Sequence, residues 1–229
     1  MTFFECGAAY EAHVIQGQKT GFFLDQRDNR QRVRAYVQNR ARSSSSSTDG
    51  IQVLNMFSYS GGFSVAAAQG GATRVVSVDI SPHAIALGEA NLALNHAQYP
   101  HCVHEHVKAD AFVYLEEAAS RARSNPNELY DVVITDPPSM ARRKSDKGGA
   151  LRAYQRLANV AVELVKPGGR LVCASCTAHV TKDEMVAAVE MGVGGRGTVV
   201  EVTGEAEDHP ALFPEAHYLK CVFVDVPLN

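Results

Sequence analysis

Short apolar runs alternate with helix-like segments through most of the chain after residue 50, and this alternation is the strongest constraint on the fold. The runs cover residues 51–56, 74–78, 103–109, 130–135 and 170–174. Ser81 and Pro82 form a helix start, since serine caps and proline suits the first helical position, and this helix should reach Asn95. Pro167, Gly168 and Gly169 predict the turn into the fifth strand. The pattern predicts an α/β fold with a mostly parallel sheet, helices on both faces and ligands at the carboxyl ends of the strands.

A separate leader precedes this alternation. Residues 3–24, with Gly17 and Gly21 as turn points, predict a small hairpin, and residues 27–42 predict a basic helix with Val33 and Val37 on its apolar side. A serine-rich loop at residues 43–50 then separates the two parts. We therefore expect a leader of residues 1–50 and a main domain of residues 51–229.

Composition narrows the cellular setting. The net charge of −3 argues against a bulk electrostatic grip on nucleic acid, although a local basic patch remains compatible with it. Five cysteines form an odd set, and the N-terminal residues lack the pattern of a signal peptide. No apolar run approaches the roughly 18 residues of a membrane span. The sequence predicts a soluble, cytoplasmic protein without membrane contact.

The stretch NMFSYSGGFSV, from Asn55 to Val65, resembles a nucleoside-binding loop. Asp79 closes the next strand, where a carboxylate can accept from both hydroxyls of a ribose. The spacing of the glycines differs from G-x-G-x-x-G, which cradles a pyrophosphate at a helix start, so a cofactor without phosphate fits better. The structural alternative is that Gly61 and Gly62 only make a tight strand-to-helix turn.

The segment YDVVITDPPSM places Asp136 at the carboxyl end of a buried strand. The two prolines that follow hold the backbone extended beside the expected cleft. Asp136 can orient the edge of a base from this position.

Six motifs in this order resemble class I S-adenosylmethionine-dependent methyltransferases, and within them the bacterial 23S rRNA cytosine-5 methyltransferase family. They are TGFFLDQRDNR, NMFSYSGGFSVAAAQGGA, SVDIS, DPPS, ASCTAHV and HPALFPEAHYLK. Members of that family usually carry an N-terminal PUA domain, which these 229 residues do not contain, so RNA affinity has to come from elsewhere or the chain is an incomplete member.

The resemblance implies a site for S-adenosylmethionine. It places a loop around the methionine part, Asp79 at the ribose, an adenine neighbourhood after the third strand, and two leader residues that close over the cofactor. Arg27 has the alternative of an ordinary surface charge. The implied residues are Asp25, Arg27, Phe57, Ser58, Tyr59, Gly61, Asp79, Ser81, Asp110, Ala111, Asp136 and Pro137.

Methylation of cytosine C5 requires a nucleophile, because C5 becomes reactive only after a thiolate adds at C6. Cys176 lies just beyond the fifth strand and is the candidate, with His179, Arg142, Arg143 or Lys144 as groups that could favour its thiolate. Asp136 would hydrogen-bond the cytosine edge. The alternative for Cys176 is a small buried side chain, which is the expected role of Cys173.

The residue after the two prolines differs from related enzymes. Many RNA cytosine-5 methyltransferases have a second cysteine there, and methylases of amino groups often have an aromatic residue that stacks on the base. Ser139 is neither, which disfavours nitrogen chemistry and leaves the base for the final elimination unidentified.

Two clusters of charge suggest an RNA surface, with a solvated helix face as the alternative for each residue. The clusters comprise Arg27, Arg30, Arg32, Arg34, Arg40 and Arg42 in the leader, and Arg142, Arg143, Lys144, Lys147, Arg152 and Arg156 after the prolines.

The run His101 to His106 resembles a metal cluster. It has no evident carboxylate or CxxC partner, so we expect no metal.

The leading hypothesis is an enzyme that forms 5-methylcytosine in large-subunit ribosomal RNA. Methylation of another RNA atom, such as a guanine nitrogen, and a catalytically silent RNA-binding module are the alternatives, and an oxidoreductase is a distant fourth. Asp79, Asp136 and Cys176 together count against the silent module. The oligomeric state stays open, a homodimer included.

Overall fold

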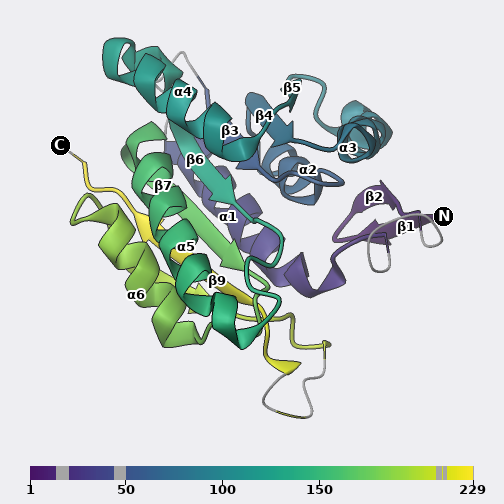
Figure 1. Ribbon diagram of the computed structural model, residues 1–229. Helices are drawn as coiled ribbons and strands as arrows, with labels where there is room; N and C mark the ends of the chain where they lie inside the picture. Colours follow the sequence, from purple (N-terminus) through teal and green to yellow (C-terminus); the bar gives the residue numbers. More distant parts are fainter. Residues whose placement is uncertain (14–20, 44–49, 210–212, 214–215, 229) are drawn as a thin grey trace. The chain divides into compact units, whose positions relative to one another are not determined.

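The computed structural model describes residues 1–13, 21–43, 50–209, 213 and 216–228. The chain forms two compact units, Met1–Asp110 and Ala111–Asn229, which run from purple to teal and from teal to yellow in Figure 1. The expected boundary near residue 50 adjoins residues 44–49, which lie outside the described residues, and it stays a prediction.

The predicted N-terminal hairpin is confirmed, but its turn lies earlier than expected. Strands β1 (Thr2–Glu5) and β2 (Ala8–Glu11) are antiparallel and join through Cys6 and Gly7. Both turn residues have positive φ, 49° and 86°, as the favoured two-residue hairpin turn requires. The turn at Gly17 and Gly21 was therefore wrong: Gly21 lies beyond the hairpin, and Gly17 lies outside the described residues.

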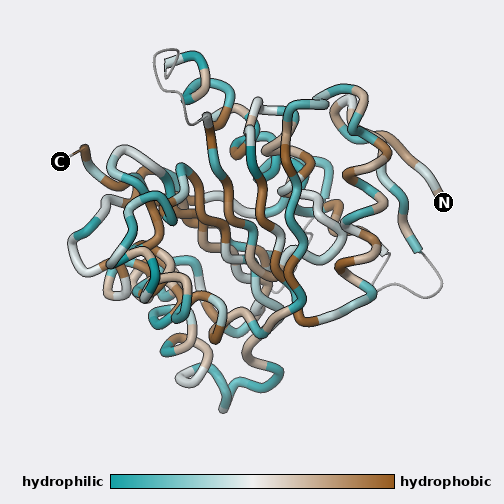
Figure 2. Tube along the Cα trace, turned by 90° about the horizontal axis from the view of Figure 1, so that it is seen from above, coloured by the Kyte–Doolittle hydropathy of each residue, from teal (hydrophilic) through white to brown (hydrophobic). Residues whose placement is uncertain are grey.

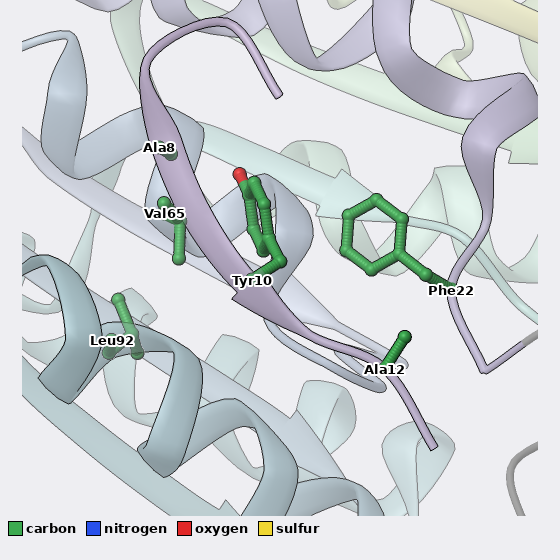
Figure 3. Close-up of a cluster of buried hydrophobic side chains, with 6 residues drawn as sticks. All are labelled: Ala8, Tyr10, Ala12, Phe22, Val65 and Leu92. Atoms are coloured by element: carbon green, nitrogen blue, oxygen red, sulfur yellow. The ribbon is translucent and has the colours of Figure 1, made fainter. Parts of the chain in front are cut away.

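The hairpin is anchored in the first unit by a small apolar core. Tyr10 lies against Phe22, with ring centroids 4.7 Å apart, and both point into the same cluster in Figure 3. Helices α2 (Gly62–Gln69) and α3 (Pro82–Asn95) contribute one aliphatic side chain each. The buried members are Ala8, Tyr10, Ala12, Phe22, Val65 and Leu92.

Two asparagines of α3 complete the attachment through the hairpin backbone. Asn95 accepts a hydrogen bond from the Ala9 N–H at 2.9 Å and donates one to the Ala9 carbonyl at 2.7 Å. Asn91 accepts from the Glu11 N–H at 2.6 Å. These amides satisfy the strand edge of β2 as a neighbouring strand would, so the hairpin is an integral part of the first unit.

The predicted basic helix is confirmed as α1 (Arg27–Ser43), preceded by one helical turn at Leu24–Gln26. Val33 and Val37 are buried, as their spacing predicted. Arg30 is also buried, at 2% exposure, and it forms a two-pronged ion pair with Glu5 of β1. The assignment of Arg30 to an RNA surface was therefore wrong, because its charge is paired with Glu5 inside the unit.

The sheet strands of the first unit follow the predicted positions closely. Strands β3 (Gln52–Met56), β4 (Arg74–Asp79) and β5 (Val103–Lys108) are parallel and lie in the order β5-β4-β3. Helix α3 begins as predicted, with the Ser81 hydroxyl accepting from the Ala84 N–H at 3.3 Å, and it ends at Asn95.

The second unit has its own strands in the order β6-β7-β9-β8. Its first two strands are parallel, whereas β9 is antiparallel to both of its neighbours. Strands β8 and β9 were not predicted from the sequence, although TVVEVT and KCVFVD are rich in β-branched and aromatic residues. The elements are α4 (Ala111–Ser124), β6 (Tyr130–Thr135), α5 (Lys147–Ala161), β7 (Val165–Ser175), α6 (Lys182–Val193), β8 (Thr198–Thr203) and β9 (Lys220–Asp225).

Strand β7 begins five residues earlier than the predicted start at Arg170. Its pairing with β6 shifts between Tyr130 and Val132, so the Pro167-Gly168-Gly169 segment forms an irregularity within the strand rather than the turn before it. A side chain at Gly169 would lie 2.8 Å from the Asp131 carbonyl oxygen, which explains why glycine is required there.

The predicted α/β class with a mostly parallel sheet is confirmed. The strands are mostly brown in the hydropathy trace, while teal residues lie on the loops and the outer turns of the helices (Figure 2). Nearly continuous apolar strands are typical of parallel sheets covered on both sides. No helix in the described part of the chain is long and apolar enough to cross a membrane.

Candidate functional site

The loop between β3 and α2 is the most strained backbone segment of the first unit. Phe57 and Tyr59 have positive φ, 57° and 43°, although neither is glycine, and Gly61 has a φ of 74°. Residues other than glycine adopt a positive φ rarely and at a cost of about 1 to 3 kcal/mol each. Such strain is concentrated at ligand-binding sites, so the loop predicted from the sequence is the candidate cofactor site.

Three backbone N–H groups of this loop donate hydrogen bonds within the protein. The Ser58 N–H donates to the Val78 carbonyl at 3.0 Å, and the Gly61 N–H donates to the Ser58 carbonyl at 2.9 Å. The Tyr59 N–H donates to Asp79 Oδ2 at 3.0 Å. These three hydrogen bonds hold the strained loop in its conformation.

Asp79 lies at the carboxyl end of β4 and organises the loop around it. Its Oδ1 accepts from the Ser81 N–H at 2.9 Å, while Oδ2 accepts from Tyr59. A carboxylate has about four acceptor positions, so each oxygen retains capacity for one more donor. The half-buried carboxylate therefore fits a ligand with two adjacent hydroxyl groups, such as the ribose of S-adenosylmethionine.

The leader residues predicted for the cofactor site adjoin a residue that contacts the same loop. The Phe23 and Tyr59 rings meet edge to face, with centroids 5.2 Å apart, which joins the leader to the loop. Asp25 is buried at 4% exposure in the adjoining helical turn. Arg27 is half-buried and pairs with Asp28 at 3.1 Å, which gives it a local structural partner.

The residues predicted beside the adenine follow β5. The Ala109 N–H donates to the Asp79 carbonyl at 3.1 Å, so the ends of β4 and β5 are joined. Asp110 is exposed directly after this bond, and Ala111 is buried as the first residue of α4.

Replacement of Asp79 by alanine is expected to weaken S-adenosylmethionine binding by about 1 to 3 kcal/mol, a factor of roughly 5 to 150 in Kd. The expected loss has two sources: the proposed hydrogen bonds to the ribose, and the hydrogen bond from the Tyr59 N–H that holds the loop. Calorimetric titration measures it, and Glu117→Gln, an exposed carboxylate on α4, is the control. Unchanged affinity in Asp79→Ala would remove Asp79 from the cofactor site.

In the second unit, the two predicted catalytic residues emerge from neighbouring parallel strands. Asp136 and Pro137 follow β6 directly, and Cys176 follows β7 directly. Because Thr135 lies opposite Cys173 in the ladder, both segments leave the sheet at the same edge. Asp136 and Cys176 are each half-buried.

A buried hydroxyl network fixes these two segments to one another. Thr177, fully buried, accepts from the Met140 N–H at 3.1 Å and lies 3.4 Å from the Ser139 hydroxyl. The Tyr154 hydroxyl of α5 lies 2.6 Å from Thr177 Oγ1 and 2.9 Å from Ser175 Oγ. The segments before and after Cys176 are therefore tied to the segment that follows Asp136.

The protonation of Tyr154 in this network depends on its burial and on nearby charges. Burial raises the pKa of Tyr154, the hydrogen bonds from Ser175 and Thr177 lower it, and the charges of Cys176 and Asp136 raise it further. Tyr154 thus stays a neutral hydroxyl in the environment of both candidate catalytic groups.

The two neighbouring cysteines differ as the sequence predicted. Cys173 is buried at 3% exposure inside β7, and burial raises the pKa of its thiol to about 12. Cys176 lies beyond the strand and is partly accessible. His179, Arg142, Arg143 and Lys144, which were considered as its activating groups, are all exposed side chains.

Three residues of this region were missed from the sequence: Tyr154, Thr177 and Lys220. Lys220 is buried at 4% exposure, and its ammonium donates to the Thr177 carbonyl at 2.8 Å. A lysine directly before the apolar run CVFV was the available signal for it.

His104 and His106 lie on the same side of β5, as strand alternation predicted, and both are half-buried. Neither His104 nitrogen has a hydrogen-bond partner among the described residues. Burial, followed by the charges of His106 and His96, lowers the pKa of His104 to about 4. The described residues contain no group of three or more side chains placed to hold a metal.

Stability should therefore depend on pH through His104. Its pKa rises to about 6.5 on unfolding, so the unfolded chain binds more protons between these values and stability falls as the pH drops from about 6.5 towards 4. Urea unfolding at pH 7 and pH 5 should show a smaller loss for His104→Leu than for the wild type. The exposed His101→Leu is the control, and equal losses in all three proteins would contradict the prediction.

The basic residues after the prolines divide into two groups. Lys147 pairs with Glu184 and Arg156 pairs with Glu116, so their charges are offset. Arg142, Arg143, Lys144 and Arg152 are exposed and form no ion pair with the described residues. These four side chains offer to a polyanion a positive charge that is unpaired among the described residues.

Known proteins resemble this chain along nearly its full length. Residues 2–219 match the sequence profile of the S-adenosylmethionine-dependent methyltransferases. A ribosomal RNA large subunit methyltransferase of Deinococcus radiodurans is 46% identical over 229 residues, which are 99% of this chain and 52% of that protein. A ribosomal RNA large subunit methyltransferase I of Salmonella paratyphi C is 38% identical over 221 residues, 94% of this chain and 50% of that protein. The chain thus spans about half the length of these relatives.

Solved structures give the same result. A methyltransferase complexed with SAH superposes with a TM-score of 0.79 at 29% identity, over 99% of this chain and 56% of that chain. An S-adenosylmethionine-dependent methyltransferase of Streptococcus mutans gives a TM-score of 0.79 at 28% identity, over 99% of this chain and 55% of that chain. The Rossmann-like methyltransferase fold expected from the sequence is confirmed.

Proposed function

Because the chain belongs to the S-adenosylmethionine-dependent methyltransferase family, we propose that it methylates C5 of a cytosine in large-subunit ribosomal RNA. The RNA class is suggested by the names of its relatives from Deinococcus radiodurans and Salmonella. The choice of C5 rests on Cys176, since a carbon of the ring needs a covalent nucleophile whereas a nitrogen does not.

The observation that carries this proposal is the position of Asp136 and Cys176. Both follow the carboxyl ends of the parallel strands β6 and β7, where open α/β sheets place their ligands. The hydroxyl network through Thr177 holds the two segments in a fixed relation. A carboxylate and a thiol held together in this way suit a base that is bound by its edge and attacked at a neighbouring carbon.

The proposed reaction assigns a separate step to each residue. The Cys176 thiolate forms a bond to C6 of the cytosine, while Asp136 hydrogen-bonds the base edge and stabilises the protonated form of the base during this addition. S-adenosylmethionine supplies the electrophilic methyl group when it is bound. A base then takes the C5 proton, and cleavage of the bond between sulfur and C6 restores the C5–C6 double bond and releases Cys176 as its thiolate.

The cofactor side of the proposal involves both strained backbone and charge. Phe57, Ser58, Tyr59 and Gly61 would surround the methionine part, and Asp79 the ribose. The structural supports are the positive φ values in the loop and the remaining acceptor capacity of the carboxylate. The remaining proposed contacts are Asp25, Arg27, Ser81, Asp110, Ala111, Asp136 and Pro137.

RNA is the proposed macromolecular partner, and a ribosomal substrate implies a cytoplasmic location. The exposed Arg142, Arg143 and Lys144 follow the segment that contains Asp136, so they are suited to contact the phosphates beside the target base.

Neutralising Arg142, Arg143 and Lys144 to glutamine should flatten the salt dependence of RNA binding. Each lost phosphate contact lowers the slope of log affinity against log salt by about 0.7 to 0.9, so the triple variant should lose about 2 to 3. Arg121→Gln with Arg123→Gln is the control, because these arginines pair with Glu128 and Glu163. A slope equal to that of the wild type would assign the three charges to a solvated loop.

Nucleoside analysis tests the proposed function. The protein is incubated with unmodified large-subunit ribosomal RNA and methyl-labelled S-adenosylmethionine, and the label should appear in 5-methylcytidine. RNA that contains 5-fluorocytosine should trap the protein covalently, since fluorine at C5 does not leave as a proton. Label in a methylated guanine, without a covalent adduct, would replace the proposal with nitrogen methylation.

A further inference from the structure

Lys220 is a buried cation whose contacts lie on both sides of Cys176. It is the first residue of β9 and lies opposite Ser175 in the ladder between β7 and β9. Its Nζ donates to the Thr177 carbonyl at 2.8 Å and to the Tyr218 carbonyl at 2.9 Å. The strand pairing thus aligns Lys220 with the residue before Cys176, and the hydrogen bond joins it to the residue after Cys176.

Three acidic groups act on the charge of Lys220, and two of them are engaged elsewhere. Burial lowers the pKa of Lys220, and the charges of Glu205, Cys176 and Glu184 raise it. The two carboxylates, Glu184 and Glu205, bind other groups. Glu184 pairs with Lys147 and caps α6, while Glu205 accepts from the Leu219 N–H and pairs with His217. No described carboxylate forms an ion pair with Lys220, so the thiolate of Cys176 is the anion that remains.

We propose that Lys220 is the positioning residue that stabilises the thiolate form of Cys176. Its hydrogen bond to the Thr177 carbonyl holds the ammonium at the segment of residues 175–177, and its charge offsets the negative charge that forms when the thiol releases its proton to solvent. A buried cation is more effective in this role than an exposed one, because solvent and salt screen it less. This inference rests on the proposed function, and it assigns Lys220 the activating role that the sequence suggested for exposed cations.

The rate of alkylation of Cys176 tests the proposal, because only the thiolate reacts. The protein without RNA or cofactor is treated with iodoacetamide from pH 5 to pH 10, and the labelling of the Cys176 peptide is followed by mass spectrometry. Lys220→Met removes the charge, whereas Lys220→Arg retains it. The exposed Cys6 gives an internal reference in the same samples.

In Lys220→Met the pH midpoint of Cys176 labelling should rise, with about tenfold slower labelling at pH 7, the equivalent of one pKa unit. Lys220→Arg should keep the midpoint closer to the wild-type value, and Cys6 should not change. A structural role alone would alter the limiting rate at high pH and leave the midpoint in place. A Lys220→Met midpoint equal to that of the wild type, or an equal rise in Lys220→Arg, would overturn the proposal.

Folding and function are controlled separately. Thermal unfolding identifies a variant that has lost its structure, and Lys220→Gln then replaces Lys220→Met, because a neutral amide retains hydrogen-bond donors without the charge. The 5-fluorocytosine trap on the wild-type protein tests the proposed function without any change at Lys220. Alkylation therefore reports on Lys220 even if the methylated atom is not C5, and the trap reports on C5 even if Lys220 has no effect.

Discussion

Cys176→Ala is expected to abolish methyl transfer while leaving S-adenosylmethionine binding unchanged. If the thiolate forms the bond to C6, no other group makes C5 reactive, and losses of about a thousandfold or more follow when a covalent nucleophile is removed. Cofactor binding should survive, because Cys176 acts on the base and is not among the proposed cofactor contacts. Single-turnover methylation measures the first effect and calorimetric titration the second.

Cys173→Ala provides the matched control for this prediction. Its thiol is buried in β7, three residues before Cys176, and burial keeps it protonated. Removing it should cost only packing, on the order of 1 to 2 kcal/mol of unfolding free energy, with methylation retained. Substantial methylation by Cys176→Ala would instead favour the guanine-nitrogen alternative, in which this cysteine has no chemical part.

The parallel strands were predictable because their signals are local. An apolar run such as residues 130–135, which is buried throughout, identifies its own strand, and the Ser81-Pro82 pair identifies the start of α3 to the residue. The hairpin turn was misplaced because glycines later in the leader were chosen over Cys6 and Gly7. A cysteine at a positive φ has no sequence signal, since only the surrounding strand pairing imposes that conformation.

The candidate site could be predicted in part for a similar reason. Asp136 and Cys176 each follow a strand, so strand positions alone predict the edge at which they lie. Lys220 is 44 residues beyond Cys176, and it reaches that segment only through the antiparallel β9, which was not predicted. The Tyr154 hydroxyl reaches Thr177 from a helix in the same way. These are tertiary contacts, which neither composition nor periodicity reveals.

The leader shows where charge counting fails. Six arginines between residues 27 and 42 resemble an RNA-binding helix, but Arg30, the most buried of the six, stabilises the fold. Its Nε and Nη2 donate to the two Glu5 oxygens at 2.7 and 2.6 Å, and its Nη1 donates to the Phe23 carbonyl at 2.8 Å. Arg30 also lies 4.6 Å from the centroid of the Phe22 ring. It thereby joins β1, the segment before α1 and α1 itself.

Arg30→Met is therefore expected to destabilise the protein by about 3 to 5 kcal/mol, because the Glu5 carboxylate is left buried without its partner. Urea unfolding measures the loss, and Arg42→Met, at the exposed end of the same helix, should change stability by less than about 0.5 kcal/mol. The double variant Glu5→Leu with Arg30→Met separates the cost of the orphaned charge from the worth of the pair. It should be more stable than Arg30→Met alone, since no buried charge remains. A loss below about 1 kcal/mol in Arg30→Met would show that water reaches the Glu5 carboxylate once its partner is removed.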